Sequence, residues 1–544
     1  MTLRMQWVVG IAFLVLTSPP RSDGEVLIVQ PNGERLIGET IGPASNGVRA
    51  VMLYRGYTIQ VPATAVGSVW TFDPSRSDDR KVFSNRLAAL KPEDITGNIA
   101  LANWGMETGL VVQAHALLHR LWERNPKHKE LIARLESPPA PASLSDADRA
   151  RLEEQVRLYF ASPTNREPVL RALRGTDAIP PGEAERWAAL AFSEARRGPT
   201  LSAGDTVFRA GDLSSSVHIE LWRKPGTAPA TNAAAAPERW PVLVTLHGGG
   251  EGDGAWTSGG PALFSLFQRH FDRLILVAPT VMEKRYAEWA GNPKEEILVH
   301  ELLKAVKRTW PVDTDRVFLA GISMGGYGTW HIGGHEADTF ALVSQIGGIL
   351  IGFKRGETWG WGIIGNLMHT PIAFTHGGKD NQSPPWSDAA SDRILTELAS
   401  VHPGLFRHKY LFFPSAGHDG TGGAEAVQFI APSVRNPAPA KILWEPSRPY
   451  YRNFFWLRAD RPRLFTRLEA SVADNTFTIR TTGLPGGFSV WMDPRLVDLT
   501  KPVTIRVDDH VVFRSLVRST LSAILESVDD KIDPQMWYPA RVDF

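Results

Sequence analysis

The stretch that most constrains this chain is a glycine-rich turn between two apolar segments. Arg316-Val-Phe-Leu-Ala320 is typical of a buried strand, and Tyr327-Gly-Thr-Trp-His-Ile332 is typical of the start of a helix. Between them lies Gly321-Ile-Ser-Met-Gly-Gly326, in which small residues flank Ser323. A strand that turns directly into a helix leaves no room for bulky flanking side chains. The pattern therefore predicts that the Ser323 hydroxyl is exposed at the edge of a sheet, where it can act as a nucleophile.

The region around this turn alternates continuous apolar segments with helical ones. Such alternation indicates a mostly parallel sheet that is covered by helices on both faces. We therefore expect one α/β domain over residues 214–432. Its predicted strands are 217–222, 240–247, 274–279, 316–320, 342–346, 371–375 and 407–413, and its predicted helices include 294–308 and 387–400.

Three further regions flank this domain. Short strands between glycine-containing turns predict a small β module over 24–72, and helical patterning predicts a helical region over 84–200. Alternation with a period of two predicts a β-rich C-terminal module over 440–544. The predicted elements in these regions are strands at 25–30, 51–54, 57–61, 476–480, 488–491 and 503–507 and a helix at 513–528.

The first residues have the layout of a signal peptide. Arg4 is followed by a short apolar segment and then by polar residues, which predicts a signal peptide over 1–23 that is too short to span a bilayer. We therefore expect a secreted or periplasmic protein with no stable membrane insertion after cleavage. The alternative is an ordinary apolar N-terminal segment.

Composition excludes several classes of function. The formal net charge of +1 over 544 residues gives no electrostatic reason to bind nucleic acid. The chain has no cysteine, which excludes disulfides, a thiol nucleophile and cysteine-ligated zinc. The zinc-hydrolase spacing His-Glu-x-x-His is absent, and His300, His331 and His335 are expected to be packing or surface residues.

A nucleophilic serine requires a base and a group that orients the base. His418 lies in Pro414-Ser-Ala-Gly-His418, just after the last predicted strand of the α/β domain, and is the predicted base. A solvent-facing loop histidine is the alternative. Asp380 follows the strand at 371–375 and is the predicted acid, although it could instead form an Asx turn. Asp388 competes for this role from the following helix, and His376 is expected to be structural.

An oxyanion hole is predicted from a second glycine run, Leu246-His-Gly-Gly-Gly250, which follows a strand. Glycines let a backbone N–H approach the reacting oxygen without interference from a Cβ atom. Either Gly248 or Gly249 could donate, and we favour Gly249. The second donor would be the N–H of Met324, the residue after the nucleophile. A phosphate-binding loop is excluded because no Gly-Lys-Ser/Thr follows the run.

Together these motifs carry a family resemblance. The strings 246–250, 312–330, 376–380 and 417–418 resemble the α/β-hydrolase superfamily. Within it, the chain is similar to the extracellular predicted-peptidase and polyhydroxybutyrate-depolymerase-like esterase branch, near the catalytic domains of prolyl oligopeptidases. The resemblance covers about 214–432, while the flanking modules depart from the family. It implies hydrolysis of an ester or a peptide through an acyl-enzyme, without metal or organic cofactor.

Three functions stay open, and a serine esterase acting on a small or polymeric ester is the leading one. The second is a serine peptidase of the prolyl-oligopeptidase type, which would need an anchor for a free α-amine. Glu295 and Glu296 are the adjacent acidic pair, but they are expected on the solvated face of a helix. No propeller repeat precedes the domain, which also favours an esterase. The third is a non-catalytic adhesion or scaffold protein, and an intact set of Ser323, Asp380 and His418 argues against it.

Overall fold

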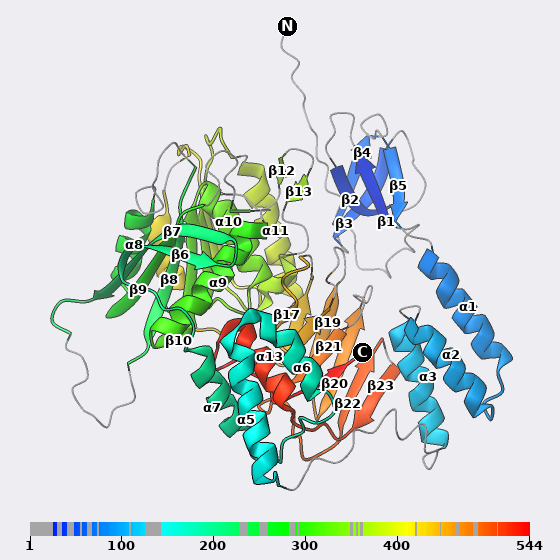
Figure 1. The fold of residues 1–544 in the computed structure, drawn as a ribbon. Helices are drawn as coiled ribbons and strands as arrows, with labels where there is room; N and C mark the ends of the chain where they lie inside the picture. The colour runs from blue at the N-terminus through cyan, green and yellow to red at the C-terminus, as the bar shows by residue number, and fades with distance from the viewer. Residues whose placement is uncertain are drawn as a thin grey trace. The chain divides into compact units, whose positions relative to one another are not determined.

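Figure 1 shows the computed structural model of the chain. The chain forms two compact units, one of residues 1–91 and 351–361 and the other of residues 92–350 and 362–544. The predicted signal peptide lies outside the described residues. At 25–81, 106–107, 111–112, 342–346, 352–359 and 386 only the backbone elements are described. The structure describes residues 25–544 except for 30–34, 41–47, 55–56, 63–67, 73–74, 108–109, 126–142, 228–237, 250–258, 282–288, 291–292, 349–351, 355–356, 360–362, 384, 419–420, 447, 461, 463–466, 482–487 and 509.

The first unit is built around an antiparallel sheet of order β4-β3-β2-β1-β5. The three strands predicted here correspond to β1, β3 and β4, while β2 and β5 were not predicted. A two-stranded sheet from the distant segment 351–361 belongs to the same unit. Its elements are β1 (Glu25–Val29), β2 (Arg35–Thr40), β3 (Val48–Tyr54), β4 (Tyr57–Pro62), β5 (Ser68–Phe72), α1 (Ser75–Ala89), β12 (Gly352–Lys354) and β13 (Glu357–Trp359).

The second unit contains an eight-stranded sheet of order β15-β14-β11-β10-β8-β9-β7-β6. The neighbours from β15 to β9 are parallel, whereas β6, β7 and β9 pair in antiparallel fashion. Every strand predicted for the α/β domain is present within a few residues of its predicted bounds. The strands are β6 (Gly204–Ala210), β7 (Leu213–Arg223), β8 (Trp240–Leu246), β9 (Arg273–Pro279), β10 (Val312–Ile322), β11 (Leu342–Ile346), β14 (Ile372–Gly377) and β15 (His408–Phe413).

Helices cover both faces of this sheet. Ala373 of β14 belongs to an apolar cluster that also contains buried residues of α8 and α12. The next residue, Phe374, lies with its ring 5.1 Å from the ring of Trp330 in α10. Because successive residues of a strand point to opposite faces, α10 covers the face opposite α8 and α12. The helices, with η3, are α8 (Gly260–Gln268), α9 (Pro293–Thr309), α10 (Met324–His335), η3 (Gly365–Met368), α11 (Pro385–Val401) and α12 (Gly423–Ile430).

The sheet begins at β6, ten residues before the predicted domain boundary at 214. β6 is an edge strand in which only Phe208 is buried, so its sequence shows no continuous apolar run. The strand is held by antiparallel pairing with β7 across a turn at Gly211, whose φ is 63°. An edge strand of this kind has little sequence signal, so the sequence pattern places the start of the domain after β6.

The C-terminal region forms two antiparallel-rich sheets of orders β16-β19-β20-β22-β23 and β17-β18-β21-β24. The predicted helix over 513–528 is wrong in its first part, because Phe513 pairs with Ile505 in the sheet. The helix begins only after Thr520, whose side chain accepts a hydrogen bond from the backbone N–H of Ala523. The elements are β16 (Lys441–Trp444), β17 (Asn453–Phe454), β18 (Leu457–Ala459), β19 (Leu468–Ala473), β20 (Thr476–Thr481), β21 (Phe488–Met492), β22 (Val503–Val507), β23 (His510–Ser515), α13 (Leu521–Lys531) and β24 (Ala540–Asp543).

The helices predicted over 84–200 have two different sets of partners. Buried residues of α5, α6 and α7, among them Leu152 and Trp187, share one apolar core with Ile524 and Val528 of α13. Figure 1 shows these helices side by side. The pair α2 and α3 lies elsewhere, with α3 against β23. The early helices therefore share a core with the end of the chain. The elements are α2 (Ile95–Glu107), α3 (Val111–Arg124), α5 (Asp146–Ala161), η2 (Pro163–Asn165), α6 (Arg166–Leu173) and α7 (Ala184–Ala195).

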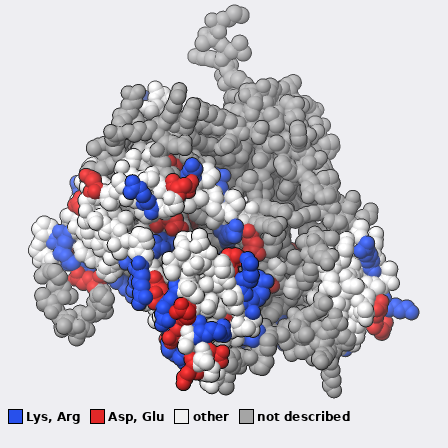
Figure 2. All heavy atoms as spheres, viewed as in Figure 1, with Lys and Arg blue, Asp and Glu red and all other residues white. Residues whose placement is uncertain are grey.

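Charges on the described surface are mixed in sign. On the face in Figure 2, Lys and Arg side chains alternate with Asp and Glu side chains. Some of these charges pair across the helices, for example Arg149 with Glu183 at 2.9 Å between α5 and the start of α7. Within the described part of the chain, no helix combines the length and the apolar character needed to cross a membrane.

Candidate active site

Ser323 lies at the turn between β10 and α10, as the sequence predicts. Its φ is 54° and its ψ is −116°, a conformation that non-glycine residues rarely adopt. The flanking glycines are required by space: a Cβ atom on Gly321 would lie 2.2 Å from the carbonyl oxygen of Gly325. A Cβ atom on Gly325 would lie 1.9 Å from the carbonyl oxygen of Leu246. The first turn of α10 therefore packs directly on the end of β8, and Ser323 projects from the edge of the sheet.

The structure brings His418 and Asp380 together with Ser323. His418 lies in the loop after β15, and its Nε2 is 2.7 Å from the Oγ of Ser323. Its Nδ1 is 2.7 Å from the Oδ2 of Asp380, which lies in the loop after β14. In this geometry Nδ1–H donates to the carboxylate, and the Nε2 lone pair faces the serine hydroxyl. That is the tautomer in which an imidazole can take the serine proton.

Asp380 is held as an anion by its surroundings. Burial by itself would raise the pKa of Asp380. The hydrogen bonds that its carboxylate accepts outweigh burial and hold the pKa below its usual value. The donors are the imidazole of His418 and the backbone N–H groups of Ser383 at 2.9 Å and Gln382 at 2.8 Å. The carboxylate therefore stays ionised where it meets His418.

The order of these residues along the sheet decides the fold. Counted from β6, the eight strands lie in the spatial order 1-2-4-3-5-6-7-8. The serine follows the fifth strand, the aspartate the seventh and the histidine the eighth. All three lie at the carboxyl ends of their strands, where open α/β sheets carry their sites. Residues 204–430 have the α/β-hydrolase fold.

The glycine run that follows β8 in this region lies beside the turn that carries Ser323. A Cβ atom on Gly249 would be 3.9 Å from the Cβ of Met324, so the two predicted oxyanion donors are neighbours. The carbonyl oxygen of Gly248 is 2.8 Å from the Nδ1 of His247. In a planar trans peptide the N–H points opposite to the C=O, so the N–H of Gly249 points away from His247. This orientation favours Gly249 over Gly248 as the donor.

His247 holds the glycine run in place, and the sequence interpretation did not single it out. Its Nδ1–H donates to the carbonyl of Gly248, while its Nε2 accepts from the backbone N–H of Val281 at 3.3 Å. Trp289 donates its indole N–H to the carbonyl of His247 at 3.1 Å. Burial lowers the pKa of His247, which keeps the ring neutral and suits this pattern of one donor and one acceptor. The position between a strand and a glycine run was the signal that could have identified it.

Asp388, the competing acid, does not contact the predicted base. Its Oδ2 is 2.7 Å from the Nδ1 of His376, and both side chains are fully buried. His376 in turn places its Nε2 3.3 Å from the Oδ2 of Asp380. Asp380, rather than Asp388, is therefore the carboxylate in contact with His418.

One group of described side chains has ligand types suited to a metal ion. The ligand atoms of Glu296, His331 and His335 lie within 4.8 Å of one another, and all three residues are buried. However, Glu296 already accepts a hydrogen bond from the hydroxyl of Tyr450 at 2.8 Å and lies 3.6 Å from the guanidinium of Arg448. The fixed positive charge of Arg448 opposes a second cation at this point. The group is better explained as packing between α9, α10 and the segment before β17.

The environment of Glu295 and Glu296 differs from the prediction. Glu295 and Glu296 were expected on a solvated helix face, but both are 0% exposed. Helix α9 packs against α10, and Tyr450 and Arg448 cover Glu296 from the C-terminal region. The helical periodicity identified the helix but not this second covering layer.

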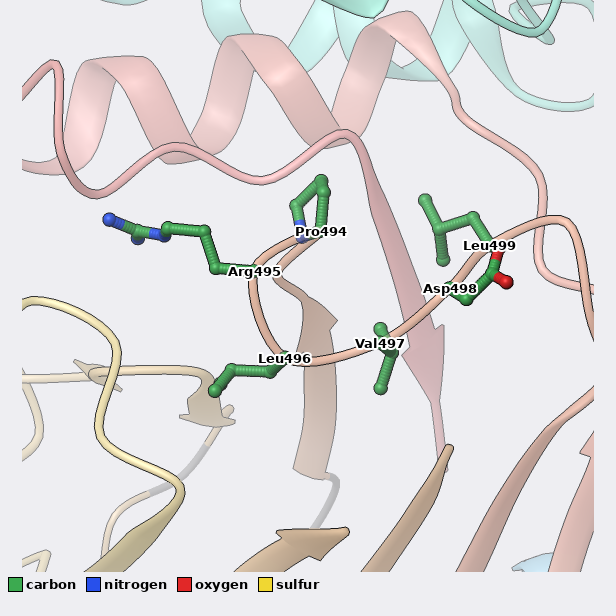
Figure 3. Close-up of a pocket in the computed structure, with 6 residues that line it drawn as sticks. All are labelled: Pro494, Arg495, Leu496, Val497, Asp498 and Leu499. Atoms are coloured by element: carbon green, nitrogen blue, oxygen red, sulfur yellow. The ribbon is translucent and has the colours of Figure 1, made fainter. Parts of the chain in front are cut away.

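Apart from the triad loops, a surface hollow is found in the C-terminal region. It is lined by residues 494–499, in the connection between β21 and β22 (Figure 3). Arg495 points away from the other labelled side chains and binds Asp493 and the carbonyl of Gln535. None of the predicted site residues lines it, and its walls bring no set of reactive groups together.

Solved structures of other proteins are similar to part of this chain. No protein-family model matches the chain, and no curated protein matches its sequence. S-formylglutathione hydrolase from Staphylococcus aureus is 16% identical over 42% of this chain and 98% of its own, with a TM-score of 0.31. A ferulic acid esterase from Anaeromyces mucronatus is 17% identical over 43% of this chain and 90% of its own, with a TM-score of 0.32.

A third solved structure differs in length. A dipeptidyl aminopeptidase IV-like protein from Bacteroides ovatus is 14% identical over 42% of this chain but only 34% of its own, with a TM-score of 0.31. Each of these matches covers less than half of this chain. We take neither a substrate nor a residue role from these proteins.

Proposed function

We propose that the protein is a serine hydrolase that cleaves carboxylic esters through an acyl-enzyme. The observation that carries this proposal is the chain of contacts from Ser323 through His418 to Asp380, with both links at 2.7 Å. A strained backbone at Ser323 adds support, because such strain persists mainly where function requires it.

The reaction follows from the geometry of these groups. The Oγ of Ser323 bonds to the ester carbonyl carbon while its proton passes to the Nε2 of His418. The oxyanion that forms is stabilised by the N–H groups of Met324 and Gly249. The bond to the alcohol then breaks as His418 returns the proton to the leaving oxygen. Water repeats these steps on the acyl-enzyme and releases the acid, while Asp380 holds the imidazolium in place.

The choice of an ester over a peptide rests on the buried acidic pair. A peptidase that binds a free α-amine needs accessible carboxylates. Both glutamates of the adjacent pair are buried, and Glu296 is engaged by Tyr450 and Arg448. The serine-peptidase function therefore stays the second candidate. Export to the periplasm or the medium is part of the proposal and rests on the sequence of residues 1–23 alone.

The test is hydrolysis of p-nitrophenyl esters of short and long acids, beside chromogenic peptides. We expect ester turnover by the wild-type protein and a loss of at least about 10⁴-fold in kcat/KM for Ser323→Ala. Ser415→Ala is the matched control, because Ser415 is an exposed serine in the same loop as His418. Labelling by a fluorophosphonate, which reacts with activated serines, gives a readout that depends on no particular substrate.

The outcomes separate the three candidate functions. Ester turnover and labelling that both vanish in Ser323→Ala support the proposal. A preference for peptides would promote the peptidase. Absence of both turnover and labelling in the wild-type protein would favour a scaffold, and unchanged activity of Ser323→Ala would rule out this serine as nucleophile.

A further inference from the structure

A second histidine–aspartate pair lies directly behind the triad acid. His376 is the second-to-last residue of β14, and Asp388 lies in α11. The side chains of His376, Asp388 and Asp380 are all 0% exposed. The proposed reaction uses Asp380 alone, so it leaves this buried pair without a role.

Every group that the His376 ring faces is a hydrogen-bond acceptor. Its Nδ1 lies 2.7 Å from the Oδ2 of Asp388. Its Nε2 lies 3.0 Å from the carbonyl oxygen of Ser383 and 3.3 Å from the Oδ2 of Asp380. A backbone carbonyl has no proton to donate, and an ionised carboxylate only accepts. Both ring nitrogens must therefore carry a hydrogen for all of these contacts to be favourable.

We propose that His376 is a positioning residue, held as an imidazolium between Asp388 and Asp380, that fixes the charge and orientation of the triad acid. The inference rests on the proposed function, since it assigns a partner to the same Asp380. It places Oδ2 of Asp380 between the Nδ1–H of His418, which donates to it at 2.7 Å, and the charged ring of His376, whose Nε2 is 3.3 Å away. The other oxygen, Oδ1, is held by two backbone N–H groups.

The electrostatic surroundings support a charged ring. Burial opposes the charge, but the hydrogen bond and the negative charge of Asp388, with a smaller contribution from Asp380, raise the pKa of His376 above its ordinary value. From the neighbouring strand, Tyr410 of β15 lies near Asp388, and burial raises the pKa of this phenol so that it stays neutral. The His376 ring thus faces two carboxylates and the Ser383 carbonyl, with the neutral Tyr410 phenol near Asp388 and the His418 imidazole beyond Asp380.

The imidazolium has two consequences for the reaction. It supplies a counter-charge that lets a buried carboxylate remain ionised. It also partly offsets the negative charge that Asp380 presents to His418, so His418 gives up a proton more readily than it would beside an isolated carboxylate. Removal of the His376 charge should therefore make His418 hold its proton more tightly. The acid limb of the pH profile of kcat/KM should then move to higher pH.

Two variants separate the charge from the hydrogen bond. In Asp388→Asn the amide can donate to Nδ1, so a neutral His376 keeps Nε2–H towards Asp380 but loses its charge. In His376→Gln both the ring and its charge are lost. We expect the midpoint of the acid limb to rise by about one pH unit in each variant. We also expect kcat to fall about 10-fold in Asp388→Asn and further in His376→Gln, with KM within about twofold of wild type.

The control is His218→Gln, because His218 of β7 also pairs with a carboxylate at 2.7 Å, that of Asp205 in β6, but at the surface and away from the triad. Thermal unfolding of each variant checks that the fold is kept. A merely structural role would lower stability without moving the acid limb. An unmoved midpoint in both folded variants would therefore overturn the inference, whereas an inactive wild-type protein would overturn the proposed function instead.

A spectroscopic measurement tests the proton directly and does not need activity. In protein with nitrogen-15-labelled histidine, a ring with both nitrogens protonated differs from a neutral ring in its nitrogen shifts. We expect one such ring to persist at about pH 8, above the ordinary range of histidine, and to disappear in His376→Gln. A neutral ring for His376 at that pH would contradict the proposal, even if the enzyme is active.

Discussion

Helix α10 begins at the proposed nucleophile and ends in a sealed cluster, and its two ends show how one element can serve chemistry and packing. At the first end, Ser323 is partly exposed and its oxygen meets the imidazole of His418. At the second end, His331 and His335 are buried, and the ring of His335 stacks on Tyr451 at 5.3 Å. His418, in a loop, is thus the proposed base, whereas burial keeps His331 neutral as a packing group.

The largest expected difference between the two ends is in turnover. Asp380→Asn should lower kcat by about 10⁴-fold, because the amide no longer fixes the productive tautomer of His418. Glu296→Gln, at the packing end, should change kcat by less than about threefold. Steady-state kinetics with one activated ester measures both. Equal losses in the two variants would mean that the far cluster takes part in the reaction.

The next difference is in tolerance to a single methyl group. Gly325→Ala would place a Cβ atom 1.9 Å from the backbone oxygen of Leu246, which cannot move without displacing β8. Gly334→Ala would meet the side chain of Ile363 at 2.8 Å, which can adjust in part. We expect Gly325→Ala to lower the free energy of unfolding by about 3 kcal/mol or more, and Gly334→Ala by less. Urea unfolding measures both, with Gly417→Ala, where a Cβ atom meets nothing within 4 Å, as control.

The sequence predicted the contacts among Ser323, His418 and Asp380 better than it predicted what surrounds these residues. Ser323, Asp380 and His418 follow apolar strands at special turns, and such local signals survive without knowledge of the tertiary fold. The burial of Glu296 depends on Tyr450 and Arg448, more than 150 residues later in the chain, and no local pattern contains that information. The same holds for His376: the sequence named Asp388 only as a competitor of Asp380, and its contact with His376 was not predicted.

Some predicted element boundaries were wrong for a related reason. The segment after Phe513 has apolar residues at spacings that suit a helix, but pairing with Ile505 in β22 makes its first part a strand. Strand β6 has one buried side chain and exists because β7 offers it an edge. In both places long-range pairing decided between local alternatives of similar free energy.

A smaller effect tests whether His331, at the packing end of α10, is uncharged in the folded protein. Burial, with Arg448 nearby, lowers the pKa of His331 from 6.5 to about 3. The unfolded chain then binds a proton below about pH 6.5 that the folded chain does not, so this contribution to stability is present above that pH and is lost as the pH falls. At about pH 5 the loss is about 2 kcal/mol. Urea unfolding between about pH 7 and pH 5 should therefore show a steeper decline for wild type than for His331→Leu. Equal slopes would show that His331 is not buried as a neutral ring.

The smallest expected effect concerns the loop that faces the catalytic end. His247→Asn keeps a polar side chain but loses the ring that spans the Gly248 carbonyl and the Val281 N–H. We expect kcat to fall by about 10-fold with little change in KM, because the Gly249 N–H is less well oriented. Trp289→Phe, which removes one hydrogen bond to the His247 carbonyl, should act in the same direction and more weakly. A change confined to KM would place this loop in substrate binding rather than in oxyanion stabilisation.

The shared core of α5, α7 and α13 can form only late in biosynthesis, because α13 is synthesised long after α5 and α7. The backbone N–H of Ser522 donates to Asp177 across 345 residues of sequence. At ribosomal speeds of about 5–20 residues per second, tens of seconds pass between the synthesis of α5 and α7 and the synthesis of α13. During that time the apolar side chains around Trp187 lack their final cover. This part of the molecule can close only after α13 (Leu521–Lys531) has been synthesised, so a nascent chain has a long interval in which chaperones can engage it.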